Sequence, residues 1–298
     1  MKLTICTALY NRELLIKRLY ESLRNQTNQE FEWIIVDDGS VDKSYSTVQS
    51  FLQEQNKFLI KIYKQNNAGK HVAINRGIDY ATGDLFFIVD SDDYLPKDAV
   101  EKIYKQFRNL NDADKIAGIS AIKAYNEENI VGKSFDAGLD YIDISNLERK
   151  KHGIIGDRAE VYYTSVLRRY MFPVFENEKF ISEATVWNKI AYDGYKLRFT
   201  NDIIYYCEYL ENGLSKNIQN VFLKNWNGYS FYVNQEIKFR KGIYNKLTII
   251  LAYVKLAKMK GNDLKDIKSQ IDNAPLVLVI MAVLLQSSYR IVTKILDN

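Results

Sequence analysis

The sequence is poor in the residues that stabilise small secreted domains or bind structural metals. Its 298 residues include only two cysteines and two histidines. Cys6 and Cys207 lie far apart in the chain, and Cys6 falls inside an apolar pattern typical of a strand. A disulfide framework and a cysteine-rich zinc site are therefore excluded. The two histidines are not at metal-ligand spacing from either cysteine, and the composition fits a reducing compartment, so we expect a cytoplasmic location.

Long apolar runs and a strong net charge are also missing. The longest apolar run, from Ala274 to Leu285, has 12 residues, which is too short to cross a bilayer as a helix. The net charge of +4 does not favour nucleic acid as the main partner. Met1 leads directly into a strand pattern, so we expect no signal peptide.

Two phosphate-binding motifs are absent as well. The chain has no Gly-x-Gly-x-x-Gly, so a dinucleotide-binding domain is only weakly supported, and it has no Walker A spacing. Gly69-Lys70 nevertheless stands where a helix is expected to begin. The free N–H groups and dipole of a helix start favour an anion, and Lys70 would add a point charge. A surface lysine without a ligand is the alternative.

The most informative stretch that is present runs from Asp84 to Pro96. Five apolar residues, Leu85 to Val89, are typical of a strand buried on both faces. Three carboxylates follow at once: Asp90, Asp92 and Asp93. Carboxylates this close repel one another unless a cation lies between them, and Mg²⁺ or Mn²⁺ takes carboxylate and phosphate oxygens together. The stretch predicts a metal that holds a diphosphate, and an acidic turn that only caps the next helix is the alternative.

Two further acidic positions are candidates for binding or catalysis. Asp37 and Asp38 end a second expected strand, where a carboxylate can accept hydrogen bonds from a base or a ribose. An Asp-Gly turn with no ligand explains them equally. Glu183 opens an expected helix and could deprotonate a sugar hydroxyl. Stabilisation by the helix dipole is the alternative explanation.

Strand and helix patterns alternate over the first half of the chain, which predicts an α/β fold with a mostly parallel central sheet. Helices are expected at residues 11–25, 43–55, 69–81 and 96–107, with strands between them. Residues 115–125 and 130–135 suggest a hairpin. From residue 221 the pattern becomes helical, over 221–240, 243–260 and 275–296. We therefore expect a catalytic domain at 1–212 and a helical appendage at 213–298.

Taken in order, these segments resemble the inverting glycosyltransferases of family 2, which have the GT-A fold. The resemblance covers about residues 1–210, and the ordered set is more specific than any single motif. It is carried by four segments: Thr7–Arg12, Ile34–Ser40, Asn67–Gly77 and Ala81–Asp93. Ala8 departs from the family, where a proline is common, and Ser182-Glu183 stands where many relatives have Glu-Asp.

The resemblance implies a role for each candidate residue. The metal, Mn²⁺ or Mg²⁺, would be bound directly by Asp92, with Asp90 facing the ribose and a metal-bound water. Glu183 would be the catalytic base, one methylene longer than usual. The other implied nucleotide-sugar contacts are Thr7 and Tyr10 beside the base, Asp37 and Asp38 at the uracil or ribose, and Lys70, Asn75 and Ser91 toward the rest of the donor.

The implied activity is transfer of a sugar from a UDP-sugar to a hydroxyl of a bacterial surface glycan such as a capsular polysaccharide, with a lipid-linked acceptor and inversion of configuration. A sugar nucleotidyltransferase is a rival, but residues 7–12 lack the Gly-rich basic loop that it needs. A nucleotide-sugar-binding subunit without turnover is a second rival, and a scaffold that recruits partners through its tail is a third.

The C-terminal region carries the strongest local charge. Residues 236–260 contain seven Lys or Arg and one acid, interleaved with aromatic residues. A basic aromatic helix can lie on an anionic membrane surface, which suits a lipid-linked acceptor at the inner face of the cell membrane. Packing of these helices on one another, or on a second copy in a homodimer, explains their apolar faces equally well.

Overall fold

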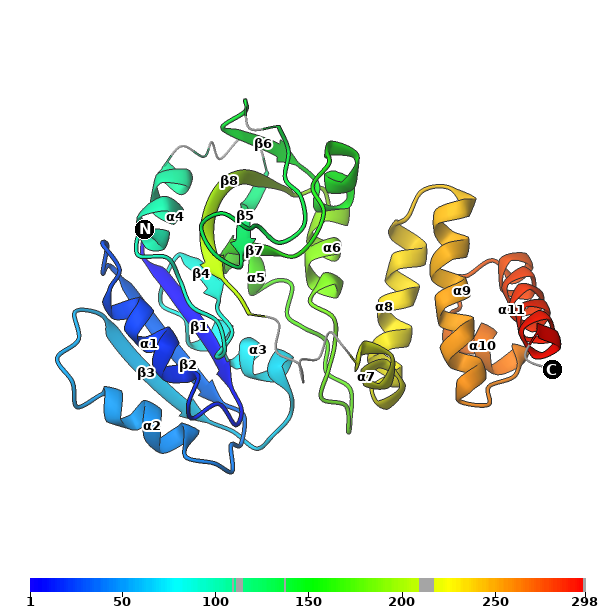
Figure 1. The fold of residues 1–298 in the computed structure, drawn as a ribbon, viewed down its shortest axis with the longest axis horizontal. Helices are drawn as coiled ribbons and strands as arrows, with labels where there is room; N and C mark the ends of the chain where they lie inside the picture. Colours follow the sequence, from blue (N-terminus) through cyan, green and yellow to red (C-terminus); the bar gives the residue numbers. More distant parts are fainter. Residues whose placement is uncertain (109, 111–114, 137, 209–216, 297–298) are drawn as a thin grey trace. The chain divides into compact units, whose positions relative to one another are not determined.

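A computed structural model of the chain describes residues 1–108, 110, 115–136, 138–208 and 217–296, with side chains described as far as Gln286. The chain forms two compact units (Figure 1). The sheet unit comprises Met1–Phe172 and Val186–Leu210, and the helical unit comprises Pro173–Thr185 and Glu211–Asn298. The boundary expected near residue 212 lies outside the described residues.

The sheet unit is built on one eight-stranded sheet with the order β3-β2-β1-β4-β7-β5-β8-β6. Pairing is parallel among β3, β2, β1 and β4 and between β5 and β8, and it is antiparallel at the other three junctions. The strands are β1 (Leu3–Leu9), β2 (Phe31–Asp37), β3 (Leu59–Lys64), β4 (Leu85–Ile88), β5 (Ile116–Ala124), β6 (Tyr141–Ile144), β7 (Arg158–Tyr163) and β8 (Lys196–Tyr206).

Helices of the sheet unit connect and cover these strands. They are α1 (Ile16–Arg24), α2 (Ser44–Phe51), α3 (Lys70–Tyr80), α4 (Ala99–Arg108), α5 (Thr164–Leu167), the 3₁₀ helix η2 (Asn146–His152) and α6 (Ala184–Tyr192), whose first two residues belong to the helical unit. α3 contacts β1 and β2, whereas α4 contacts β5 and β8. The α/β fold predicted from the strand and helix patterns is confirmed.

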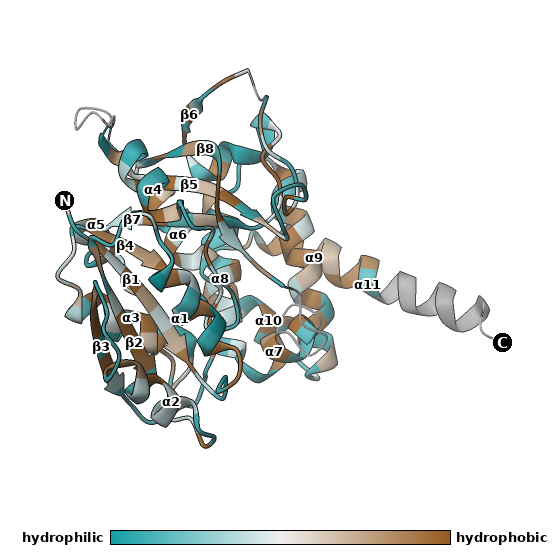
Figure 2. Cartoon of the chain, turned by 60° about the vertical axis from the view of Figure 1, so that its left-hand side comes forward, coloured by the Kyte–Doolittle hydropathy of each residue, from teal (hydrophilic) through white to brown (hydrophobic). Residues whose placement is uncertain are grey.

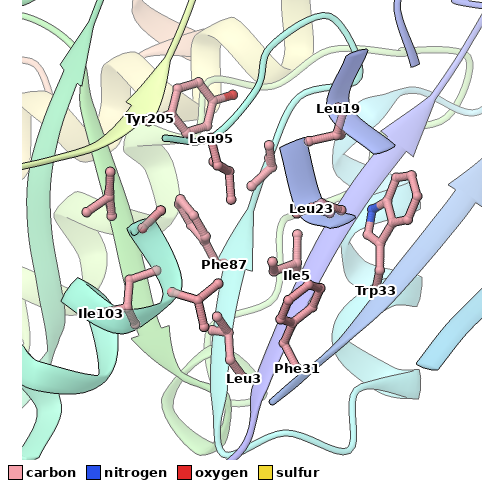
Figure 3. Packing of buried hydrophobic residues seen from close by; sticks show 14 of the residues in the cluster. Leu3, Ile5, Leu19, Leu23, Phe31, Trp33, Phe87, Leu95, Ile103 and Tyr205 are labelled. Atoms are coloured by element: carbon pink, nitrogen blue, oxygen red, sulfur yellow. The ribbon is translucent and has the colours of Figure 1, made fainter. Parts of the chain in front are cut away.

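The core of the sheet unit follows from those patterns. β1 and β2 are buried along their whole length except for one partly exposed residue in β1, as expected for strands covered on both faces. Figure 3 shows side chains of β1, β2 and β4 meeting the apolar face of α1, with Leu19 and Leu23 close to Ile5 and Trp33. The fully buried Phe87 of β4 lies in the same cluster.

Several local expectations were wrong because tertiary contacts replaced local signals. Asn11 does not cap a helix: its backbone has φ 52°, its side chain accepts a hydrogen bond from the backbone N–H of Val41, and α1 begins only at Ile16. Residues 130–135 form isolated bridges instead of a hairpin strand. Residues 221–240 form two helices that meet at Asn225.

The helical unit has its own apolar core. Its helices are α7 (Ile218–Lys224), α8 (Trp226–Phe239), α9 (Ile243–Met259), α10 (Leu264–Gln270) and α11 (Leu276–Leu296). Trp226 stacks on Tyr253 with ring centroids 4.9 Å apart. The side chain of Gln270 accepts hydrogen bonds from both rings' polar groups, at 2.9 and 2.8 Å. The C-terminal helices that the sequence predicts are therefore present, and Figure 2 shows apolar residues along α9 and α11.

Membrane spans were also sought among the helices of the described ranges. None is both long enough and apolar enough to cross a bilayer.

Candidate active site

The candidate site lies where the parallel strands β1, β2 and β4 end at one edge of the sheet. Leu9 of β1 is in register with Asp37 of β2, and the Val89 N–H after β4 donates to the carbonyl of Cys6. Parallel strands place their carboxyl ends at the same edge, which is where open α/β sheets bind ligands. We call this the carboxyl edge. The turn that follows β4 brings Asp90, Ser91, Asp92 and Asp93 to it.

Asp90 forms the shortest ion pair of this edge. Its Oδ1 lies 2.6 Å from Nζ of Lys70, the first residue of α3. Burial alone would raise the pKa of Asp90, but the cations of Lys70, Lys123 and Arg12 outweigh burial and hold its pKa below the ordinary value. Asp90 is therefore an anion that already attracts positive charge.

Asp92 has a looser arrangement and keeps part of its carboxylate in solvent. Its side chain is 26% exposed, and Oδ2 lies 3.4 Å from Nε of Arg12. The Arg18 guanidinium donates to the backbone carbonyl of Asp92 and lies over the Tyr94 ring, 4.7 Å from its centroid. The backbone of Asp92 is thus anchored while its carboxylate can still accept a further ligand.

Asp93 completes a crowded group of three acids. It is buried, and it accepts hydrogen bonds from the Tyr205 hydroxyl at 2.8 Å and from the Glu208 N–H at 3.3 Å. Burial, followed by the charges of Asp90 and Asp92, raises the pKa of Asp93 to about 6. The repulsion among the three carboxylates is what a bound cation would relieve.

A divalent metal at this edge would need ligands from outside the protein. Within the described ranges, no group of three or more His, Cys, Asp and Glu side chains could hold a metal ion. Asp90 and Asp92 supply hard carboxylate oxygens, which suit Mg²⁺ or Mn²⁺. The donor set fits a metal that these two residues share with the oxygens of a bound diphosphate.

Asp37 and Asp38 behave differently although they are adjacent. The Asp38 carboxylate accepts from the Gln65 side chain and from the N–H groups of Ala68 and Gly69, each at 2.8 Å. Asp38 therefore fixes the loop that leads into α3. Asp37 is fully buried, its Oδ1 accepts from the Ser40 N–H at 3.4 Å, and its Oδ2 has no hydrogen-bond partner in the described part of the chain.

The two predicted base-flanking residues also differ in exposure. Thr7 is fully buried, and its hydroxyl accepts a hydrogen bond from the Trp33 indole at 3.0 Å. Tyr10 follows β1 and is 45% exposed. Of this pair, only Tyr10 presents its side chain to solvent and hence to a ligand.

Asn75 binds backbone away from the carboxylates, and Glu183 belongs to the other unit. Asn75 uses both ends of its amide on the backbone of Phe172: Nδ2 donates to the carbonyl at 2.8 Å, and Oδ1 accepts from the N–H at 2.9 Å. Glu183 directly precedes α6 and belongs to the segment Pro173–Thr185 of the helical unit. The sheet unit thus holds every predicted site residue except Glu183.

Tyr205 is a site residue that sequence reasoning missed. Its hydroxyl accepts from the Asp90 N–H at 3.0 Å and donates to Asp93. Figure 3 shows its ring above Leu95 and Phe87 in the core cluster. The residue comes from β8, 115 positions after Asp90, and no local pattern marks it.

Arg12, which pairs with Asp92, was also not predicted as a site residue. Its position could have suggested it, since it lies in the turn after β1 that carries the family resemblance.

Comparison with known proteins places these features in a family. The family model described as "Glycosyl transferase family 2" matches residues 4–171. The "Putative glycosyltransferase EpsH" of Bacillus subtilis is 37% identical over 102 residues, which cover 34% of this chain and 29% of that protein. The "GalNAc(5)-diNAcBac-PP-undecaprenol beta-1,3-glucosyltransferase" of Campylobacter jejuni is 28% identical over 192 residues, which cover 62% of this chain and 58% of that protein. The alignments therefore span less than two thirds of these relatives.

Solved structures support the fold. "S. aureus TarS 1-349 in complex with UDP-GlcNAc" aligns with a TM-score of 0.61 at 16% identity and covers 97% of this chain and 92% of that one. "Mannosyltransferase PcManGT from Pyrobaculum calidifontis in complex with GDP-Man and Mn2+" aligns with a TM-score of 0.57 at 16% identity, over 95% and 87% of the two chains. The chain shares the GT-A fold with these proteins.

Proposed function

The chain belongs to glycosyl transferase family 2, and from that membership and the geometry of the carboxyl edge we propose that it transfers a sugar from a UDP-sugar to an acceptor hydroxyl. The proposed acceptor is a lipid-linked surface glycan. A UDP-sugar is favoured because the TarS complex holds UDP-GlcNAc. A lipid-linked acceptor is favoured because the name of the Campylobacter relative gives an undecaprenol-linked glycan. The GDP-mannose complex of PcManGT makes GDP the nucleotide to test beside UDP.

The group of Asp90, Asp92 and Asp93 is the observation that carries the proposal. Three carboxylates lie at one strand end, and the pKa of Asp93 is raised to about 6 first by burial and then by the charges of Asp90 and Asp92. Asp90 and Asp92 would hold Mn²⁺ or Mg²⁺, which when bound neutralises charge on the leaving diphosphate. Lys70, already paired with Asp90, can exchange that partner for a phosphate oxygen.

The remaining site residues would shape and orient the donor. Tyr10, which is exposed at the end of β1, would lie against the base, and buried Asp37 would accept from a base or ribose donor. Ser91 would act in the same turn as Asp90. Thr7, Asp38 and Asn75 already have protein partners, so we propose that they bind the donor indirectly, by fixing β1, the loop before α3 and residue 172.

Glu183 is the proposed general base. It would remove the proton of the acceptor hydroxyl as that oxygen attacks the anomeric carbon from the side opposite the diphosphate, so that the configuration inverts. A nucleotide-sugar-binding subunit without turnover is the second candidate. The two differ in Glu183→Gln, which would lower transfer by an enzyme to a small residual rate and would change nothing beyond binding in a non-catalytic subunit.

The donor site can be tested by thermal shift. Wild type and Asp92→Ala would be measured with UDP, GDP, CDP and ADP, each with and without Mn²⁺. Because a ligand that binds only the folded state raises the midpoint by mass action, UDP with Mn²⁺ should stabilise the wild type. Asp92→Ala should lose that response and about a hundredfold in transfer rate, or about 2.7 kcal/mol of transition-state stabilisation.

Asp79→Ala is the matched control, because Asp79 is an exposed acid on α3. It should keep the full response. Stabilisation by another nucleotide would keep the fold and change the donor. Absence of any response to all four nucleotides in the wild type would refute the proposed donor site.

We also propose that the helical unit contacts an anionic membrane surface. Exposed apolar residues recur along one side of α11: Leu276, Val277, Ile280, Met281, Leu284 and Leu285. Residues 211–298 contain 13 Lys or Arg and 6 Asp or Glu, a net charge of +7 against +4 for the whole chain. An apolar stripe on a basic unit is the combination that binds anionic lipid surfaces.

Vesicle sedimentation tests this contact. Binding to vesicles with anionic lipid, lost at high salt and in Ile280→Glu, would support it. Equal recovery in the supernatant with anionic and neutral vesicles, together with a dimer that Ile280→Glu dissociates, would assign the stripe to a homodimer instead.

A further inference from the structure

The segment Pro173–Thr185 leaves the sheet unit and returns to it after thirteen residues, and both of its flanks are fixed there. Before it, the Phe172 backbone is held by the Asn75 amide at 2.8 and 2.9 Å. After it, the ring of Trp187 in the first part of α6 makes a T-shaped contact with the Phe172 ring at a centroid distance of 5.8 Å. The segment is therefore a loop with anchored ends, and Glu183 lies near its second end.

The middle of this loop is held by reciprocal hydrogen bonds at the start of α8. Asn225 is the N-cap residue of α8, yet its side chain makes no capping hydrogen bond to its own helix. Its Oδ1 instead accepts from the N–H groups of Lys179 and Phe180 at 2.7 and 3.0 Å. The carboxylate of Glu178 caps α8 in place of Asn225: it accepts from the N–H groups of Asn227 and Gly228 at 2.7 and 2.8 Å.

Both the hydrogen bonds and the side-chain packing between the loop and the start of α8 are specific. An N-cap side chain ordinarily accepts from the second or third N–H of its own helix, and a carboxylate at that place also suits the helix dipole. A Cβ on Gly228 would meet the carbonyl oxygen of Phe180 at 3.1 Å and the carboxylate of Glu178 at 3.3 Å. The loop is further packed by two aromatic contacts, Phe175 with Phe231 and Phe180 with Phe222.

We propose that the helical unit positions the loop that carries Glu183, with Asn225 and Glu178 as the positioning residues. This inference rests on the proposed function, because it takes Glu183 as the base. It gives α7 and α8 a role in catalysis that does not depend on the membrane contact. A helical unit that served only as an anchor or a dimer contact would not need to exchange its helix cap with this loop.

The physical reason is the entropy of a thirteen-residue loop. Fixed ends alone leave its interior free to sample many backbone conformations, and a general base must be held within hydrogen-bond reach of the proton that it removes. Four hydrogen bonds to α8 and two ring contacts restrict that freedom between Phe175 and Phe180. Removing the cap should therefore reduce turnover and leave donor binding intact.

The test compares Asn225→Ala with Asn225→Asp and Asn234→Ala in the full chain. Asn225→Ala should lower kcat at least tenfold and leave the affinity for UDP with Mn²⁺ within twofold. Asn225→Asp keeps an acceptor oxygen for Lys179 and Phe180 but loses the donation from Nδ2 to the carbonyl of Val221, so it should restore part of the kcat. Asn234 is the matched control because its side chain bonds the backbone of Gln270 and Asn273 and not the loop.

A double variant separates positioning from general destabilisation. If Asn225 acts through Glu183, adding Asn225→Ala to Glu183→Gln should cause no further loss of kcat. Glu178→Gln should resemble Asn225→Ala, because Glu178 accepts from the two N–H groups of α8 through different oxygens, and glutamine replaces one of these oxygens with an NH₂ donor. Full kcat in Asn225→Ala, or equal losses in Asn225→Ala and Asn234→Ala, would overturn the inference.

Hydrogen exchange gives a readout that does not depend on turnover. Amides of residues 173–185 should exchange faster in Asn225→Ala and at the wild-type rate in Asn234→Ala. Unchanged protection in Asn225→Ala would overturn the positioning role even for a protein without detectable activity. Failure of the wild type to bind any nucleotide would refute the proposed function alone, since the loop's dependence on α8 would still be measured.

Discussion

Two edges of the same mixed sheet use carboxylates in opposite ways. At the edge where β1, β2 and β4 begin, Glu32 is fully buried and accepts hydrogen bonds from the Thr4 hydroxyl, the Thr82 N–H and hydroxyl, and Lys61, at 2.6–2.8 Å. At the carboxyl edge, Asp90, Asp92 and Asp93 repel one another. The first group is complete within the protein, whereas the second is arranged for a cation.

The pKa values of these acids express the difference. Burial acts to raise the pKa of Glu32, but hydrogen bonds from Lys61, Thr4 and Thr82 outweigh burial and lower it to about 2. The pKa of Asp93 is raised to about 6 by burial and by its acidic neighbours. Hydrogen bonds to the ionised carboxylate outweigh burial at Glu32, whereas the single side-chain hydrogen bond from Tyr205 does not outweigh burial and the charge of Asp90 at Asp93.

Breaking the Glu32 site should give the largest loss of stability. Glu32→Gln removes the buried charge that pairs with the partly exposed Lys61, so we expect the free energy of unfolding to fall by about 3 kcal/mol. Urea denaturation would measure it. Glu54→Gln is the control, because Glu54 pairs with Arg24 at the surface with 42% of its side chain exposed, and it should cost less than about 1 kcal/mol. A loss below about 1 kcal/mol in Glu32→Gln would contradict this account.

The dependence of stability on acidic pH should show the contribution of Glu32. Because the folded pKa of Glu32, about 2, lies below the ordinary value of 4.5, its contribution is fully present above about pH 4.5 and is lost as the pH falls toward 2. The contribution is about 3 kcal/mol at 1.36 kcal/mol per pKa unit. Urea midpoints between pH 2 and 5 should therefore fall less steeply in Glu32→Gln than in the wild type. Parallel curves would show that Glu32 is not the group that titrates.

The smallest loss of stability should come from two tyrosines at opposite edges of the sheet. The hydroxyl of each accepts a hydrogen bond from a backbone N–H and donates one to an oxygen. Tyr104 accepts from the N–H of Leu3 and donates to the carbonyl of Glu30, as Tyr205 does with Asp90 and Asp93. Each Tyr→Phe variant should lose about 1 kcal/mol of stability. Only Tyr205→Phe should also weaken UDP binding in the presence of Mn²⁺, by about tenfold or about 1.4 kcal/mol. Equal UDP affinity in both variants would mean that Tyr205 only supports the fold.

Much of the sheet unit could be predicted from local sequence. Apolar runs such as Leu85–Val89 are typical of buried strands, and this one forms β4, so the acids that follow it lie at a strand end. The turn Asp37-Asp38-Gly39 was likewise found from sequence. Its two acids looked equivalent there, and only the folded loop before α3 distinguishes the saturated carboxylate of Asp38 from the buried Oδ2 of Asp37.

The sequence by itself determined the α/β alternation, the family and the acids at the carboxyl edge, because hydrophobic periodicity and short motifs are local properties. Only the tertiary structure decided that Tyr205 holds the Asp90 turn from 115 residues away and that Pro173–Thr185 packs with α8. These contacts depend on which backbone N–H groups are left unpaired once helices and strands have formed. A buried N–H takes whichever acceptor the fold brings within reach, and no local pattern records that choice.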